Sequence, residues 1–215
     1  MITQLISPLI HDTIALVTIL NPIAAAGIMV SMITPPTPAN IRPVAARATL
    51  TVLIASLVTL FTGEFIFKLF GINVYSVKVI GGIILMMIAM NMAAGQSTKT
   101  RHTPEERAEA QEKEDISIIP LGIPILFGPG VIATIVVLDT HGRELFSPWV
   151  SYALISVAIL LASLTVYLVL RNAGVISRTL GVTGMKIMTR IMGLIVGAIA
   201  AQFLIGGVKS LWMGH

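Results

Sequence analysis

The sequence contains no cysteine and few charged or aromatic residues. Of its 215 residues, 11% are charged and 6% are aromatic, whereas 55% are hydrophobic, and the mean hydropathy is +0.93. The lack of cysteine excludes disulfides, thiolate catalysis and metal sites with cysteine ligands. The hydropathy is far above that of soluble domains of this length. The composition therefore predicts an integral membrane protein whose main surroundings are a lipid bilayer.

The chain also lacks the short motifs of common enzyme classes. There is no H-E-x-x-H, no G-x-S-x-G and no nucleotide-binding glycine loop, and the four histidines have no metal-like spacing. The pI is near 9.7, but the basic residues are scattered over short loops, which does not favour nucleic-acid binding. No filter motif or polar helix face supports a pore. We therefore expect no enzyme, no metal site and no cofactor.

Six stretches contain no Asp, Glu, Lys or Arg. Since about 20 apolar residues cross a bilayer, these stretches predict six transmembrane helices, the second of which extends toward Phe70. The stretches are residues 13–41, 48–63, 79–98, 116–138, 145–170 and 191–208. We expect the first helix to begin after Pro8, the second at about Val44, and the third to run from about Val77 to Gly95.

The two halves of the chain have similar patterns. Shifts of 107 to 112 residues align Asn21-Pro22 with Gly128-Pro129, Lys78 with Arg190 and Gly95 with Gly207. We interpret residues 1–95 as one three-helix repeat, residues 96–115 as a polar cytoplasmic linker with a short surface helix, and residues 116–215 as a second repeat. Three helices are an odd number, so the repeats must lie in opposite senses in the membrane. Many secondary transporters have this inverted-repeat plan.

Prolines near the middle of predicted helices 1 and 4 indicate a binding site. Proline lacks a backbone N–H and clashes with the preceding turn, so each helix must break at mid-membrane. Such backbone is tolerated only where it is buried in protein or lines a cavity. A half-helix that begins there can bind a carboxylate with its N–H groups, and unwound carbonyls can hold an ammonium or a cation. The candidate substrate-binding residues are Asn21, Pro22, Ile23, Ala24, Gly128, Pro129, Gly130 and Thr134.

Other polar residues within the helices are secondary candidates. Glu64 is a candidate coupling residue, although Lys68 lies four positions on and makes an ordinary helix ion pair the simpler interpretation. Asn91 and Gln202 lie in predicted helices 3 and 6, where they serve either as pocket lining or as hydrogen-bond partners between helices. The midplane holds no carboxylate. A proton would therefore have to be carried by Glu64 or Asp12.

The distribution of basic residues favours one orientation. With six spans both termini share a side of the membrane, and ten of the 14 Lys and Arg residues fall on the other side. The positive-inside rule places those ten in the cytoplasm. Both termini are then expected on the periplasmic or extracellular face of a prokaryotic cytoplasmic (inner) membrane.

Several of these stretches together resemble the MarC family, also called UPF0056. They are Asn21-Pro22, Gly81-Gly82-Ile83, Ile119-Pro120-Leu121-Gly122-Ile123-Pro124 leading into Gly128-Pro129-Gly130, and Thr189-Arg190-Ile191-Met192-Gly193-Leu194. The resemblance covers essentially the whole chain, including its length and its polar central segment. Members of the SnatA type imply transport of small neutral amino acids, namely glycine and alanine.

The pattern and the resemblance together favour a secondary-type transporter. We expect alternating access between the inverted repeats, driven by a gradient of a coupling cation, Na⁺ or H⁺. The alternatives are a non-transporting structural or regulatory membrane protein, in which the breaks serve only helix packing, and an exporter of another small solute. The sequence leaves a homo-oligomer open.

Overall fold

The computed structural model describes residues 2–95 and 116–213, and every regular element in these ranges is a helix. The elements are α1 (Ile2–Leu20), α2 (Pro22–Met32), α3 (Pro38–Leu69), α4 (Val74–Ala93), the π-helical segment η1 (Ser117–Leu126), α6 (Pro129–Leu145), α7 (Pro148–Arg171) and α8 (Ala173–Met213). The predicted linker at residues 96–115, with its short surface helix, lies outside the described residues.

The described helices are long and apolar enough for a membrane protein. Five helical segments have the length and hydropathy needed to cross a bilayer, and the first of them, Leu5–Met32, joins α1 from Leu5 onward to α2. The bent pair η1 and α6 would make a sixth span. The prediction of an all-helical membrane protein is confirmed. There are five candidate spans, or six if the bent pair of η1 and α6 is counted as a span.

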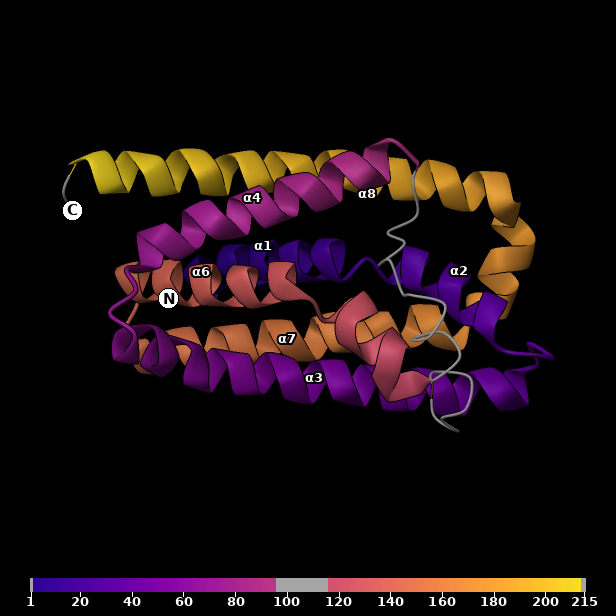
Figure 1. The fold of residues 1–215 in the computed structure, drawn as a ribbon. Coiled ribbons are helices and arrows are strands. Elements are labelled where there is room, and N and C mark those ends of the chain that lie inside the picture. Colours follow the sequence, from indigo (N-terminus) through magenta and orange to yellow (C-terminus); the bar gives the residue numbers. More distant parts are fainter. Residues whose placement is uncertain (1, 96–115, 214–215) are drawn as a thin grey trace.

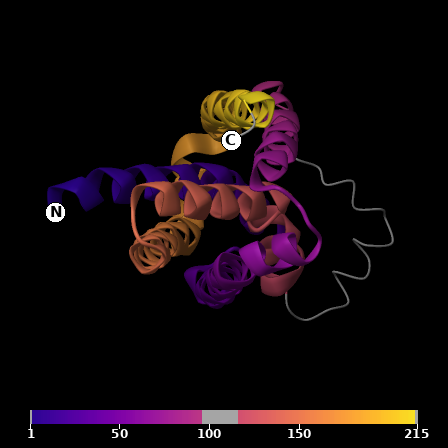
Figure 2. The same cartoon turned by 90° about the vertical axis from the view of Figure 1, so that its left-hand side faces the viewer.

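The helices lie in three layers (Figure 1). α4 and most of α8 form one outer layer, α3 and α7 form the other, and α1, α2 and α6 lie between them, while η1 packs beside α3, as the turned view in Figure 2 also shows. α1 and α2 run away from the end of the bundle where the chain termini lie, whereas η1 and α6 run toward that end. The two broken helices therefore cross the middle layer in opposite directions.

Several helix ends differ from the sequence prediction. α1 begins at Ile2 and contains Pro8 in its second turn, so the chain is helical before this proline as well as after it. α3 begins at Pro38, which suits a first helical position, where the N–H would have no partner. α4 begins earlier than predicted because Asn73 caps it by accepting a hydrogen bond from Tyr75 N–H at 2.8 Å. α8 begins at Ala173 and is interrupted at Gly181, whose φ of 61° suits glycine.

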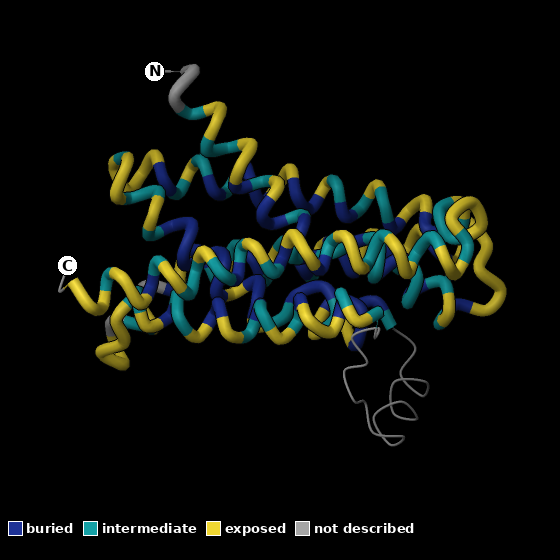
Figure 3. Tube along the Cα trace, turned by 90° about the horizontal axis from the view of Figure 1, so that it is seen from above, coloured by how far each residue is buried: buried dark blue, intermediate teal, exposed yellow. Residues whose placement is uncertain are grey.

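Buried side chains form two clusters of unequal size. The larger cluster joins α1, α2, α3, η1, α6 and α7, and the smaller consists of Leu85 and Ala89 from α4 with Val196 and Ala200 from α8. Figure 3 shows the buried positions along the inside of the bundle and exposed positions along its outside. Ile19, two residues before Asn21, packs against both clusters. The end of α1 therefore links the core to the layer of α4 and α8.

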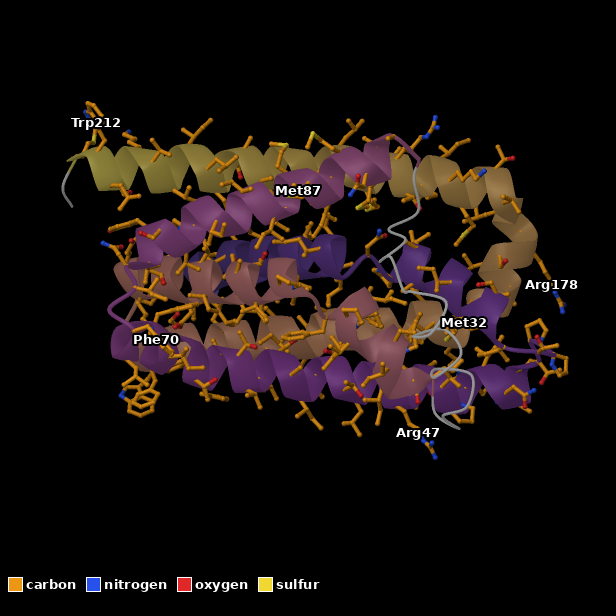
Figure 4. The ribbon with its side chains drawn as sticks, in the orientation of Figure 1. Met32, Arg47, Phe70, Met87, Arg178 and Trp212 are labelled. Atoms are coloured by element: carbon orange, nitrogen blue, oxygen red, sulfur yellow. The ribbon has the colours of Figure 1, made fainter. Side chains whose placement is uncertain are left out.

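The outer surface of the bundle is apolar along its length and differs at its two ends. In Figure 4, Met87 lies between the ends of the bundle, Trp212 and Phe70 lie at the end near the termini, Arg178 lies at the opposite end, and Arg47 lies along α3 in the half toward that opposite end. Met87 is 57% exposed, as expected for a side chain in contact with lipid. Exposed aromatic residues are typical of the level of the lipid headgroups.

Glycines allow α4 and α8 to pack backbone to backbone. A Cβ atom placed on Gly82 would lie 3.0 Å from the Ala200 carbonyl oxygen, and one on Gly193 would lie 3.0 Å from the Ala89 carbonyl oxygen. At one end of the pair, a Cβ atom placed on Gly95 would lie 2.7 Å from Nη2 of Arg190. At the other end, a Cβ atom placed on Gly207 would lie 3.0 Å from Cβ of Lys78. Gly207 of α8 thus lies beside Lys78 of α4, and Gly95, two residues after α4, lies beside Arg190 of α8.

Candidate functional site: two helix breaks that meet

The first break is a single residue, Asn21, between α1 and α2. Its φ is 46° and its ψ is 59°, and it is the one non-glycine residue with positive φ in the described part of the chain. Asparagine tolerates this conformation better than most residues. Its Oδ1 accepts a hydrogen bond from Ala24 N–H at 3.4 Å, and its Nδ2 lies 3.8 Å from Sδ of Met92 in α4. Asn21 therefore turns the chain, caps α2 and contacts α4.

The second break is longer. α6 begins at Pro129, directly after Gly128, and its axis makes an angle of 58° with that of η1. The bend falls at the predicted position, but the whole of η1 is irregular, whereas the sequence analysis predicted a helix up to the break. Ile119 and Ile123 have extended backbone inside η1, and each precedes a proline in a cis peptide bond. A residue before proline is pushed toward extended conformations. Pro120 and Pro124 were the sequence signal for this irregular segment.

Gly130 lies where the two breaks meet. A Cβ atom on Gly130 would lie 2.8 Å from Cδ2 of Leu85 and 3.4 Å from Cδ1 of Ile88, both in α4, and 3.8 Å from Cγ2 of Ile19 in α1. The first turn of α6 therefore contacts the last turn of α1 beneath α4. The contact leaves room for backbone and for no additional side chain.

Two helix N-termini face the centre of the bundle at this point. α2 and α6 begin at the breaks and run in opposite directions from them (Figure 1). Each helix opens with a proline, and the next N–H, of Ile23 in α2 and of Gly130 in α6, has no hydrogen-bond acceptor among the described residues. The positive ends of two helix dipoles thus lie at the two breaks, near the end of α1.

The other predicted site residues have different surroundings. Thr134 is fully buried on α6, but its hydroxyl donates to the Gly130 carbonyl oxygen at 2.8 Å and is therefore used within its own helix. Asn91 on α4 and Gln202 on α8 are exposed, so neither side chain is enclosed with the breaks. The backbone of Glu64 belongs to α3, and its side chain, like that of Lys68, lies outside what the structure describes.

The end of the bundle near the termini contains a charged cleft that sequence reasoning did not single out. The cleft has a volume of about 240 Å³ and is lined by Leu60, Val74, Val136, Asp139, Thr140, Arg143 and Glu144. Within it, Arg143 Nη2 lies 2.7 Å from Asp139 Oδ2. The signal in the sequence was the spacing of four residues between an acid and a base near the end of an apolar run. No group of acidic and histidine side chains in the described ranges is arranged to hold a metal ion.

Comparison with known proteins places this arrangement in one family. The model of the MarC family of integral membrane proteins matches residues 6–212. The UPF0056 membrane protein YhcE of Escherichia coli K12 is 33% identical over 202 residues, which cover 94% of this chain and 92% of the relative. YvbG of Bacillus subtilis is 32% identical over 210 residues, which cover 97% and 98% of the two chains.

A relative also occurs in an archaeon. A UPF0056 membrane protein of Methanocaldococcus jannaschii is 34% identical over 194 residues, which cover 90% of this chain and 92% of the relative. These names describe membrane proteins and give no substrate. The search of solved structures gave no significant match. The extent of the family match and the identity of the relatives show that the chain belongs to the MarC family of integral membrane proteins.

Proposed function

We propose that this protein is a secondary transporter of small neutral amino acids, glycine and alanine, and that the substrate binds between the two helix breaks when the close contact at Gly130 opens. The observation that carries the proposal is that α2 and α6 each begin at a break with an N–H, of Ile23 and of Gly130, that lacks an acceptor among the described residues, and that Gly130 lies beside Ile19 in the last turn of α1. Helix N-termini bind carboxylates well, and broken helices at mid-membrane are the usual substrate sites of inverted-repeat transporters.

The same breaks supply acceptors for the ammonium group of an amino acid. Because Pro22 has no N–H and Ala24 N–H donates to the Asn21 side chain, the carbonyls of Thr18 and Leu20 lose their usual donors four residues on. Carbonyls released in this way can bind an ammonium or a coupling cation, Na⁺ or H⁺ carried as hydronium. Carboxylate donors and ammonium acceptors side by side suit a zwitterion. The residues that follow Pro22 in α2 are mostly small, which favours a substrate with a short side chain.

The packing of α4 against α8 supports an inverted repeat. Gly95, just after α4, lies against the guanidinium of Arg190 in α8, and Gly207 of α8 lies against α4 at Tyr75, Lys78 and Val79, so each end of the helix pair has a glycine beside a basic residue. The 112-residue shift aligns the two glycines with each other and the two basic residues with each other. In this proposal the two repeats rock against each other about the breaks and expose the substrate alternately to the two sides.

The ends of the bundle support an orientation. Arg178 lies at one end and Arg47 in the half toward it, whereas Trp212 and both chain termini lie at the other end (Figure 4). By the positive-inside rule the arginine end faces the cytoplasm of a prokaryote, and the termini face the periplasm or the outside. A thiol introduced near Trp212 should then react with an impermeant reagent added to intact cells, and one introduced beside Arg178 should not.

One observation favours the alternative of a structural or regulatory membrane protein. The Asn21 side chain and the Thr134 hydroxyl, the two polar groups beside the breaks, both make hydrogen bonds within the protein. A protein in which the breaks serve only packing would show the same bonds. It would bind no small solute, and this difference separates the two functions. An exporter of another solute would bind that solute and neither glycine nor alanine.

The test is uptake of labelled glycine and alanine into proteoliposomes, with sodium and proton gradients imposed separately. We expect accumulation with one gradient and its loss in Gly130→Leu, because the new side chain would occupy the place where α1, α4 and α6 meet. Gly206→Leu is the matched control, since no neighbouring atom lies within 4 Å of a Cβ placed there. Absence of uptake under every gradient, in protein that remains folded, would reject the amino-acid proposal.

A further inference from the structure

The side chain of Leu85 in α4 fills the space beside the first turn of α6. A Cβ atom on Gly130 would lie 2.8 Å from Cδ2 of Leu85, which is fully buried. The same position would lie 3.4 Å from Cδ1 of Ile88 and 3.8 Å from Cγ2 of Ile19. The Gly130 N–H has no acceptor among the described residues. A solute that binds this N–H therefore has to place its own side chain among these three, and Leu85 is the nearest of them.

Leu85 is also the side chain of the three that moves most readily. The backbones of α4 and α6 are already in close contact one turn away, where a Cβ atom on Gly81 would lie 2.6 Å from Cβ of Ala133. Room for a solute therefore has to come from side chains. Isoleucine branches at Cβ and is held near one χ1 rotamer in a helix, whereas leucine branches one carbon further out and is less restricted.

The size of the side chain at position 85 controls the volume available here. Leu85 belongs to the small buried cluster between α4 and α8, whose other members are Ala89, Val196 and Ala200. All three are smaller than leucine. Because protein interiors contain few voids, space beside Gly130 becomes available mainly when the residue at position 85 shrinks or moves.

One face of α4 covers both breaks, with different side chains. Met92 lies seven residues after Leu85, which is about two helical turns and places both on the same face. Met92 is 2% exposed, and its Sδ lies 3.8 Å from Nδ2 of Asn21 at the first break. Methionine is unbranched and adapts its shape to its neighbours, whereas leucine is bulkier near the backbone. The restriction on size is therefore located at the second break, beside Gly130.

We propose that Leu85 determines which amino-acid side chains the substrate site accepts. In this structure its isobutyl group occupies the place that the side chain of a bound substrate takes when the contact at Gly130 opens. Glycine and alanine require only a small displacement of Leu85, and each additional carbon requires a larger one. The inference rests on the proposed function, and it adds a residue of α4 to the small residues of α2 as a determinant of substrate size.

The experiment varies the substrate and position 85 together. Uptake into proteoliposomes is measured for glycine, alanine, 2-aminobutyrate, valine and leucine, and binding is measured as the rise in unfolding temperature that each amino acid causes. Leu85→Ala removes as many carbons as leucine has in excess of alanine. We expect the ratio of kcat/KM for valine to that for alanine to rise at least about tenfold in Leu85→Ala, since one methylene in an apolar pocket changes selectivity by about 10- to 200-fold.

Three further variants separate the size of this side chain from a loss of stability. Leu85→Met nearly conserves the volume and should leave the ratio unchanged. Leu170→Ala is the matched control, because Leu170 is also fully buried but lies in the larger cluster near the end of α7. It should lower the unfolding temperature without changing the ratio. Leu85→Val removes a single carbon and should give a smaller rise, and it decides the question if Leu85→Ala does not fold.

The outcomes distinguish this inference from the proposed function. Uptake of alanine with an unchanged ratio in folded Leu85→Ala or Leu85→Val, or with an equal rise in Leu170→Ala, would overturn the role of Leu85 and leave transport intact. Stabilisation of Leu85→Ala by valine without uptake of any amino acid would support Leu85 as a determinant of binding and reject transport. Absence of both uptake and stabilisation in the unsubstituted protein and in every variant would reject both proposals.

Discussion

The two helix breaks differ in how their backbone is held. At the first, one residue in a left-handed conformation makes the turn, and its side chain caps the next helix. At the second, the irregular η1 precedes Gly128, which is extended and provides no side-chain cap for α6. The first break is therefore specified by one polar side chain, and the second by prolines and by a glycine at the point of contact. A small ligand would meet a capped helix on one side and an open helix on the other.

The largest expected effect is at the contact between the breaks. Gly130→Leu should destabilise the protein by about 1–3 kcal/mol, because overpacking of a tight contact forces neighbouring side chains to move. It should also abolish binding at the breaks. Thermal unfolding and ligand binding are measured on the same preparation, with Gly206→Leu as the control. Unchanged binding in Gly130→Leu would show that the breaks are not the binding site.

Asn21 tests the capped break. Asn21→Ala loses the cap and places alanine in a left-handed conformation, so the free energy of unfolding should fall by about 2 kcal/mol. Asn21→Gly also loses the cap but accepts the conformation, and should cost only a few tenths of a kcal/mol. Denaturant unfolding in detergent compares the two variants. Equal losses would mean that the side-chain contacts, and not the left-handed backbone, determine the effect.

The smallest expected effect is at the open break. Gly128→Ser adds a hydroxyl that can cap α6 by accepting from the Gly130 N–H, which should change stability by only a few tenths of a kcal/mol. If the substrate uses that N–H, its apparent affinity should fall a few fold. Gly128→Ala adds the same Cβ, 3.3 Å from the Pro124 carbonyl oxygen, without the hydroxyl. Equal affinity in the two variants would exclude competition for the N–H.

The sequence predicted local breaks better than long-range contacts. Asn21-Pro22 and Gly128-Pro129 were identifiable because proline forbids a regular helix whatever surrounds it. The meeting of Gly130 with Ile19, Leu85 and Ile88 was not identifiable, since it depends on how three distant helices pack. The contact of Asn21 with Met92 is of the same kind.

The polar residues within the helices show a second limit of prediction from the sequence. Asn91 and Gln202 are polar residues within apolar helices, but their identity does not determine which face of the helix they occupy, and both are exposed. Asp139 and Arg143 were passed over because charges near a helix end usually reach the headgroups. Their burial depends on Ser151 and Tyr152 of α7, which lie beside them only in the folded chain.

The length of α8 has a consequence for the response of the protein to its lipids. Its 41 residues would span about 60 Å as a straight helix, twice the ~30 Å thickness of a hydrocarbon layer. Part of α8 must therefore lie at the headgroups, and its first half carries Arg178, Lys186 and Arg190. Each such residue near an anionic membrane surface contributes about 1 kcal/mol of attraction. Since Arg190 also lies against Gly95, two residues after the end of α4, the lipid charge acts on the same helix pair that holds the outer layer together.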